Sequence, residues 1–128
     1  MSTTQGADTN YDALLSQNAT RVFSERHQAK RLAALSELWA PNGILYEEGK
    51  VIVGIDAIST AIGTLLDSLP PAARFAPDGV AVGHHGLGRL RWRAVDGSGK
   101  PMPVSGTDIA FIEEGRITTL YVLLDPVA

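Results

Sequence analysis

The sequence predicts an α+β protein in which helices come first and a mostly antiparallel sheet follows. Apolar residues recur at helical spacing in the first half of the chain, whereas the residues beyond Pro71 form short strand-like segments separated by turns that contain glycine. From Arg89 onward these segments follow one another through short turns. Such connections favour antiparallel pairing of neighbouring strands.

The size and charge of the chain fit one globular domain. It has 128 residues, of which 45% are hydrophobic and 20% charged, and its net charge is −3. We therefore expect a single domain over residues 11–128, preceded by a flexible polar tail over residues 1–10. The absence of cysteine excludes disulfide scaffolds, cysteine nucleophiles and thiolate metal sites. The acidic balance argues against nucleic acid or an anionic membrane as a partner, and with no apolar leader or membrane span we expect a cytoplasmic protein.

Three helices and a hairpin are predicted before Pro70. Residues 11–39 carry apolar side chains at steps of three, four and seven, and the polar span 24–31 divides this stretch into two helices. The segment Ala-Pro-Asn-Gly at 40–43 is expected to end the second helix. A hairpin over 44–46 and 51–53 closes at Gly49, and a third helix begins after Gly54 with Asp56 in its first turn.

The later strands are predicted at 74–76, 80–85, 89–95, 104–112 and 117–124. The last two are apolar on both faces. In the final strand, for example, Leu120, Val122 and Leu124 oppose Ile117, Tyr121 and Leu123. An antiparallel strand with one wet face would alternate, so the sheet needs a cover on each side, and the helices supply only one.

Four short motifs and their order resemble the superfamily of nuclear transport factor 2, ketosteroid isomerase and the SnoaL-like polyketide cyclases (NTF2-like). The motifs are LWAPNG at 38–43, GIDAI at 54–58, GTDIAF at 106–111 and GRI at 115–117. The resemblance covers residues 11–125 and is greatest to the SnoaL-like proteins. It implies a cone-shaped fold in which a strongly curved sheet wraps around three N-terminal helices and leaves an apolar pocket. It also implies a homodimer packed through the outer sheet face.

Asp108 is the first candidate catalytic residue. Its neighbours on the same strand face are Gly106 and Ala110, so we expect its side chain to face space that these small residues leave open. Burial there would raise the carboxyl pKa. By its motif, Asp108 resembles the protonated acid of ketosteroid isomerase, which donates a hydrogen bond to an oxyanion, and the proposed general acid/base of SnoaL-like cyclases. The alternative is a structural aspartate bonded to Tyr, Trp or backbone donors.

Glu47 is the second candidate, because the resemblance places the general base of the isomerase there. We expect its neighbour Glu48 to point to the opposite face, and a solvated hairpin tip is the alternative for both. The chain departs from the isomerase at Phe23, where that enzyme carries an oxyanion-binding tyrosine, and this departure argues against steroid isomerisation. Tyr46 or Tyr121 could supply such a hydroxyl from another wall of the pocket.

We expect a pocket that binds a small apolar carbonyl compound without cofactor or metal. The expected lining residues are Phe23, Leu35, Trp39, Tyr46, Trp92 and Tyr121, with core packing as the alternative for Trp92. His84 and His85 are neighbours in a predicted strand, so we expect them to diverge and not to share a metal.

Two functions are therefore open from the sequence. The first is a cofactor-free isomerase or cyclase that transfers protons through Asp108 and Glu47. The second is a non-catalytic module that uses the same pocket for ligand binding, or the sheet for dimerisation.

Overall fold

The computed structural model describes residues 9–126, so the predicted tail over residues 1–10 lies outside the described residues except for Thr9 and Asn10. The helical elements are α2 (Tyr11–Gln17), a π-helical turn η1 (Asn18–Val22) that continues it, α3 (Gln28–Leu38) and α4 (Ile55–Asp67). Helix α2 begins after Asn10, whose Oδ1 accepts a hydrogen bond of 2.9 Å from the backbone N–H of Ala13.

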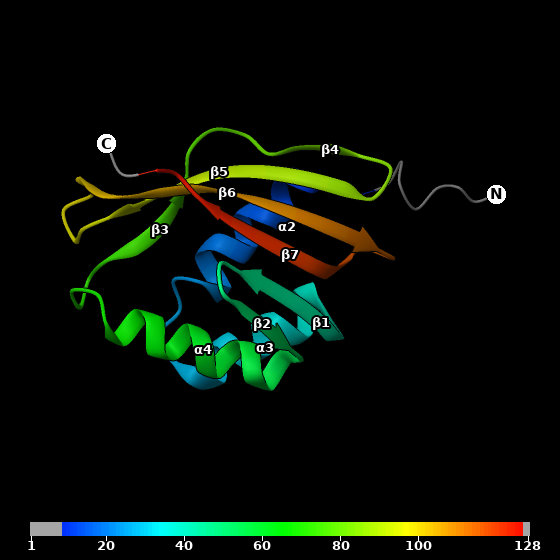
Figure 1. Ribbon diagram of the computed structural model, residues 1–128, viewed down its shortest axis with the longest axis horizontal. Helices are drawn as coiled ribbons and strands as arrows, with labels where there is room; N and C mark the ends of the chain where they lie inside the picture. The colour runs from blue at the N-terminus through cyan, green and yellow to red at the C-terminus, as the bar shows by residue number, and fades with distance from the viewer. Residues whose placement is uncertain (1–8, 127–128) are drawn as a thin grey trace.

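One seven-stranded sheet completes the fold. Its strands are β1 (Trp39–Glu47), β2 (Lys50–Val53), β3 (Arg74–Pro77), β4 (Val82–His84), β5 (Leu87–Val95), β6 (Pro101–Glu113) and β7 (Arg116–Leu124), in the order β2-β1-β7-β6-β5-β3 with β4 also paired to β5. All pairs are antiparallel except β1 with β7. The predicted α+β class with a curved, mostly antiparallel sheet is confirmed. Figure 1 shows the long strands arching over α3 and α4, with the β1–β2 hairpin between β7 and α4.

The end of the second helix differs from the prediction. Helix α3 ends at Leu38, and the segment expected to stop it is already part of β1, where Trp39 pairs with Ile117. Pairing between β1 and β7 is irregular from Trp39 to Ile44, and Pro41, which has no N–H to donate, lies within that irregularity. Trp39 is fully buried, and its Nε1 donates a hydrogen bond of 2.8 Å to Oδ1 of Asn18, which ties β1 to η1.

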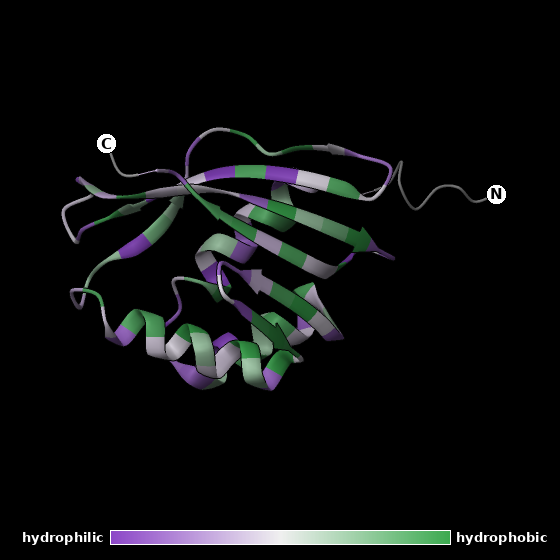
Figure 2. Cartoon of the chain, viewed as in Figure 1, coloured by the Kyte–Doolittle hydropathy of each residue, from purple (hydrophilic) through white to green (hydrophobic). Residues whose placement is uncertain are grey.

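Strand β5 alternates as its sequence predicts. Leu90, Trp92 and Ala94 are buried, and Arg89, Arg91 and Arg93 point the other way, so that β5 alternates between apolar and polar colours in Figure 2. The buried face joins the helices in one hydrophobic core. Among the residues described, no helix is long and apolar enough to cross a membrane.

The last strand contains an irregularity that the sequence pattern did not reveal. Phe111 pairs with Thr119, but Ile112 pairs with Ile117, so β7 holds one extra residue at this point. Ile117 consequently lies on the buried face with Leu120, and the prediction that it shares a face with Tyr121 and Leu123 was wrong.

The opposite sheet face carries an apolar surface that we call the outer patch. Its residues, taken from the strand registers, are Ile44, Tyr46, Val51, Val53, Ile109, Phe111, Tyr121 and Leu123. Several are strongly exposed, including Val51 (63%), Leu123 (53%) and Phe111 (42%). No helix of the described chain covers this face.

Candidate functional site

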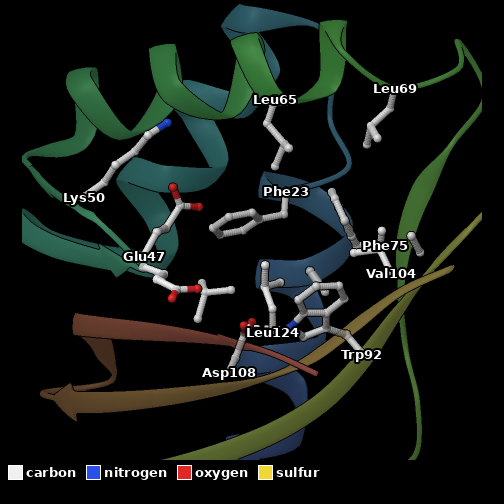
Figure 3. Close-up of a pocket in the computed structure, with 14 residues that line it drawn as sticks. Phe23, Glu47, Lys50, Leu65, Leu69, Phe75, Trp92, Val104, Asp108 and Leu124 are labelled. Atoms are coloured by element: carbon white, nitrogen blue, oxygen red, sulfur yellow. Dashed lines mark hydrogen bonds between the residues drawn. The ribbon is translucent and has the colours of Figure 1, made fainter. Parts of the chain in front are cut away.

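A cavity of about 360 Å³ lies between helix α4 and the inner face of the sheet. In Figure 3, Leu65 of α4 and Leu69, which follows the helix, form its roof, Trp92 and Asp108 belong to the strands at its floor, and Phe23 lies between them. Its lining residues are Ala19, Phe23, Glu47, Glu48, Lys50, Leu65, Leu69, Phe75, Trp92, Ala94, Val104, Asp108, Val122 and Leu124. The lining is mostly apolar, with ionisable groups only from Asp108 and the β1–β2 hairpin, which is typical of a small-molecule site.

Asp108 is held by a specific hydrogen bond at the floor of this cavity. Nε1 of Trp92 donates to Oδ1 of Asp108 over 2.9 Å, and both residues are at least nine-tenths buried. Trp92 on β5 lies directly opposite Gly106 on β6, and a Cβ atom at Gly106 would come within 2.7 Å of Cζ2 of Trp92. The absence of a side chain at Gly106 therefore leaves room for the indole to lie against β6 and to reach the carboxyl group of Asp108.

The sequence predicts open space beside Asp108, and the structure shows that this space is filled. The Trp92 ring fills the place that Gly106 leaves, and its N–H is the kind of donor expected for a structural aspartate. Among the residues described, Oδ2 of Asp108 has no hydrogen-bond partner, although the residue lines the cavity. This oxygen is therefore available to a ligand.

The environment of Asp108 favours its protonated form. Burial raises the pKa of this carboxyl group to about 7, and the hydrogen bond from Trp92 opposes the rise only in part. Both the acid and the carboxylate are then populated near neutral pH. A group of this kind can donate or accept a proton at the working pH of most proteins.

The hairpin contributes two further carboxylates from a different wall. Glu47 ends β1 and faces the cavity, and Glu48 and Lys50 line it as well. The expectation that Glu48 points to the opposite face was wrong, because Glu48 belongs to the turn, where strand alternation does not hold. In Figure 3 Glu47 and Lys50 approach the cavity from the side of the hairpin, away from Trp92.

Of the six expected lining residues, the structure places Phe23 and Trp92 at the cavity and the other four elsewhere. Leu35 and Trp39 are fully buried in the core. Tyr46 and Tyr121 stack on each other in the outer patch, with ring centroids 4.6 Å apart, so their hydroxyls do not enter the cavity. Since Leu45 faces the core, strand alternation turns Tyr46 outward.

Several lining residues were not among those we expected. Leu65 lies in the last turn of α4 and Leu69 follows two residues after its end, and Val122 pairs with Asp108 across β6 and β7. The placement of Val122 follows from the pairing of β6 with β7 once Asp108 is fixed at the cavity. Ala19 lies in the π-helical turn four residues before Phe23, on the face of the helical segment that Phe23 turns to the cavity.

The two adjacent histidines do not diverge. Their Nδ1 atoms lie 2.9 Å apart, because only His84 belongs to β4 and His85 adopts a left-handed conformation (φ 51°) in the following turn. Within residues 9–126, no group of three or more His, Cys, Asp or Glu side chains could hold a metal ion.

Comparison with known proteins identifies a family to which the sequence is similar. The sequence profile of the SnoaL-like domain matches residues 19–120. No curated protein matches the chain significantly. A solved structure of a proposed isomerase of the SnoaL-like family from Agrobacterium tumefaciens aligns with a TM-score of 0.81 at 23% identity, over 91% of this chain and 97% of that one.

Two further solved structures share the fold at lower similarity. A proposed polyketide cyclase from Sinorhizobium meliloti has a TM-score of 0.63 at 20% identity, over 86% of this chain and 93% of that one. An NTF2-like protein of unknown function from Cytophaga hutchinsonii has a TM-score of 0.63 at 12% identity, over 93% of both chains. At these identities the similarity concerns the fold alone.

Proposed function

Because the chain belongs to the SnoaL-like domain family, we propose that its apolar cavity binds a small carbonyl compound and that Asp108 exchanges a proton with it as a cofactor-free isomerase or cyclase does. The observation that carries the proposal is a carboxyl group with a pKa of about 7, buried at the floor of an apolar cavity. Perturbed carboxyl groups in clefts are typical of catalytic sites.

The proposed chemistry uses carboxylates from two walls. The Glu47 carboxylate removes a proton from the carbon next to the carbonyl, and the electron pair moves onto the carbonyl oxygen. Protonated Asp108 donates a hydrogen bond to this oxygen through its free Oδ2 and stabilises the enolate. Where the substrate has a C=C bond on the far side of that carbon, the enolate is a dienolate, and return of the proton from Glu47 to its far carbon completes an isomerisation. Attack of the enolate carbon on a second carbonyl, whose oxygen takes the proton from Glu47, completes a cyclisation.

The apolar lining favours ligands with few charges. A carbonyl compound without a carboxylate or phosphate loses little solvation on entry, whereas an anion would meet the two carboxylates of Glu47 and Glu48 against the single cation of Lys50. We therefore propose neutral ketones as the substrate class.

Proton exchange in heavy water tests the proposal directly. Apolar ketones that raise the unfolding temperature are incubated with the protein in D₂O, and deuterium uptake next to the carbonyl is followed by ¹H NMR. We expect catalysed uptake that falls about 10²- to 10⁴-fold in Asp108→Asn and in Glu47→Gln. Glu113→Gln is the matched control, because Glu113 is an exposed carboxylate on the same strand as Asp108 and lies outside the cavity.

A non-catalytic ligand-binding protein is the second candidate. Phe23 favours it, because this residue lines the cavity with no hydrogen-bond donor where ketosteroid isomerase carries its oxyanion-binding tyrosine. Ligand binding without deuterium uptake, at equal affinity in Asp108→Asn, would support this second function and overturn the first.

A further inference from the structure

A second cavity, of about 290 Å³, lies between helices α3 and α4 and has a polar lining. Its residues are Arg26, Gln28, Arg31, Thr60, Gly63, Thr64, Leu66 and Asp67, and none of them lines the apolar cavity. The proton-transfer chemistry proposed above makes no use of this cavity.

Arg31 is the unusual member of this lining, because it is a buried cation without a counter-ion. The residue is only 4% exposed. Its Nε donates to Oγ of Ser59 over 2.9 Å and its Nη1 donates to the backbone oxygen of Glu25 over 2.8 Å. Both acceptors are neutral. In residues 9–126 the carboxylate pairs belong to Arg21 and Arg91, and Nη2 of Arg31 has no acceptor.

The sequence of α4 accommodates this guanidinium group. A Cβ atom at Gly63 would lie 2.9 Å from Nη2 of Arg31, so any larger residue would displace the group. Glycine in the interior of a helix lowers its stability relative to alanine. Room for Arg31 therefore costs α4 some helix stability. Arg31, whose Nη2 has no acceptor among the described residues, lines the cavity.

We propose that this cavity binds a small oxyanion, either inorganic phosphate or the carboxylate group of a small acid, through Nη2 of Arg31. A bound anion supplies the missing counter-charge, and hydrogen bonds between charged partners are among the strongest in proteins. Arg26 provides further donors, because each of its η nitrogens carries two hydrogens and uses one of them on the backbone oxygens of Ala73 and Pro70. With Asp67 as the acid of the lining, the net charge of the cavity residues is +1, which suits a monovalent oxyanion.

Titration with phosphate, and separately with acetate, tests the proposal at constant ionic strength maintained with sodium chloride. The Nε–Hε resonance of Arg31 and the amide resonance of Gly63 are followed in ¹H–¹⁵N NMR spectra. We expect saturable shifts of both signals and a matching rise in the unfolding temperature, with chloride alone producing neither. The anion that binds more tightly identifies the preferred geometry, tetrahedral or planar.

Variants separate a site from a general salt effect. Arg26→Gln should weaken binding at least about tenfold, because a charged donor pair is lost. Asp67→Asn should tighten it about two- to fivefold by removing an exposed like charge. Arg116→Gln is the control, because Arg116 is exposed and lines neither cavity. Shifts that do not saturate with either anion, or an affinity unchanged in both Arg26→Gln and Asp67→Asn, would overturn the proposal.

Discussion

Nε1 of Trp92 donates a hydrogen bond of 2.9 Å to Oδ1 of Asp108, and this bond opposes the effect of burial on the carboxyl group. Burial favours the neutral acid, whereas an N–H donor favours the carboxylate. The pKa of about 7 is the balance of the two effects. Trp92 is therefore a positioning residue that also adjusts the protonation of Asp108.

Replacing Trp92 by Phe should raise the pKa of Asp108 above about 7, because the donor that stabilises the carboxylate is lost while the residue remains buried. Carboxyl ¹³C NMR during a pH titration measures the shift. Asp125 provides an internal control, because hydrogen bonds from Arg91 and Ser105, in which Trp92 takes no part, hold its pKa at about 2. A lower pKa for Asp108 would mean that water enters the space vacated by the indole and that this hydration outweighs the lost hydrogen bond.

Replacing Asp108 by Asn should flatten the pH dependence of folding stability. The pKa of Asp108 is about 7 in the folded state and near 3.9 when unfolded, so between these values the native state holds the proton that the unfolded state has lost. The stabilisation from this group is complete below about pH 4 and disappears as the pH rises through about 7. The wild-type protein should thus lose on the order of a few kcal/mol relative to Asp108→Asn across this interval.

Urea unfolding at a series of pH values measures this difference, with the asparagine retaining the bond to Trp92. Equal pH profiles for the two proteins would contradict the raised pKa. A wild-type profile that rises with pH relative to the variant would instead indicate an ionised, structurally anchored carboxylate.

Much of the fold could be predicted because its elements obey local rules. Helix α4 lies between Gly54 and Pro70, and β5 alternates residue by residue, so periodicity located both. The errors occur where the backbone leaves a regular repeat. The extra residue in β7 moved Ile117 to the buried face, and the turn after β1 brought Glu48 to the cavity.

The candidate site could be predicted only in part, for a similar reason. The motif around Asp108 identified one wall, but the tryptophan that bonds it is 16 positions away in sequence. The pairing of Trp92 with Gly106 depends on the register of β5 and β6, which no local pattern specifies. Tyr46 and Tyr121 were assigned to the pocket from their chemistry alone, and their positions in the strands turn them outward instead.

The outer patch leads us to propose that the protein is a homodimer in solution, with the sheets of two copies packed face to face. An exposed apolar surface on strands of this length is typical of an interface. Light scattering coupled to size exclusion should give a mass near twice 13.6 kDa. A monomer at micromolar concentration would contradict the proposal.

Phe111→Glu sharpens this test. Phe111 is 42% exposed in the single chain, so a charge there should change the stability of a monomer little but should dissociate a dimer. Val80→Glu is the matched control, because Val80 is 74% exposed and lies outside the outer patch. We expect the mass to halve in Phe111→Glu and to stay unchanged in Val80→Glu.

Gly106→Ala should both destabilise the fold and change the pKa of Asp108. A Cβ atom here would lie 2.7 Å from Cζ2 of Trp92 and 2.6 Å from the backbone oxygen of Leu123, so either the indole or β7 must move. Overpacking of this kind costs about 1–3 kcal/mol. If the indole moves, its bond to Asp108 lengthens, and the pKa of Asp108 should rise as it does in Trp92→Phe.

A double-mutant cycle with Trp92→Phe separates the two contacts of this glycine. Phenylalanine lacks the Cζ2 atom of the indole, so Gly106→Ala should cost less in the Trp92→Phe protein than in the wild type, and the remainder reports the contact with the oxygen of Leu123. Chemical unfolding of the four proteins measures the coupling. An equal cost of Gly106→Ala in both backgrounds would show that the glycine serves the β6–β7 pairing alone and that the position of Trp92 does not depend on it.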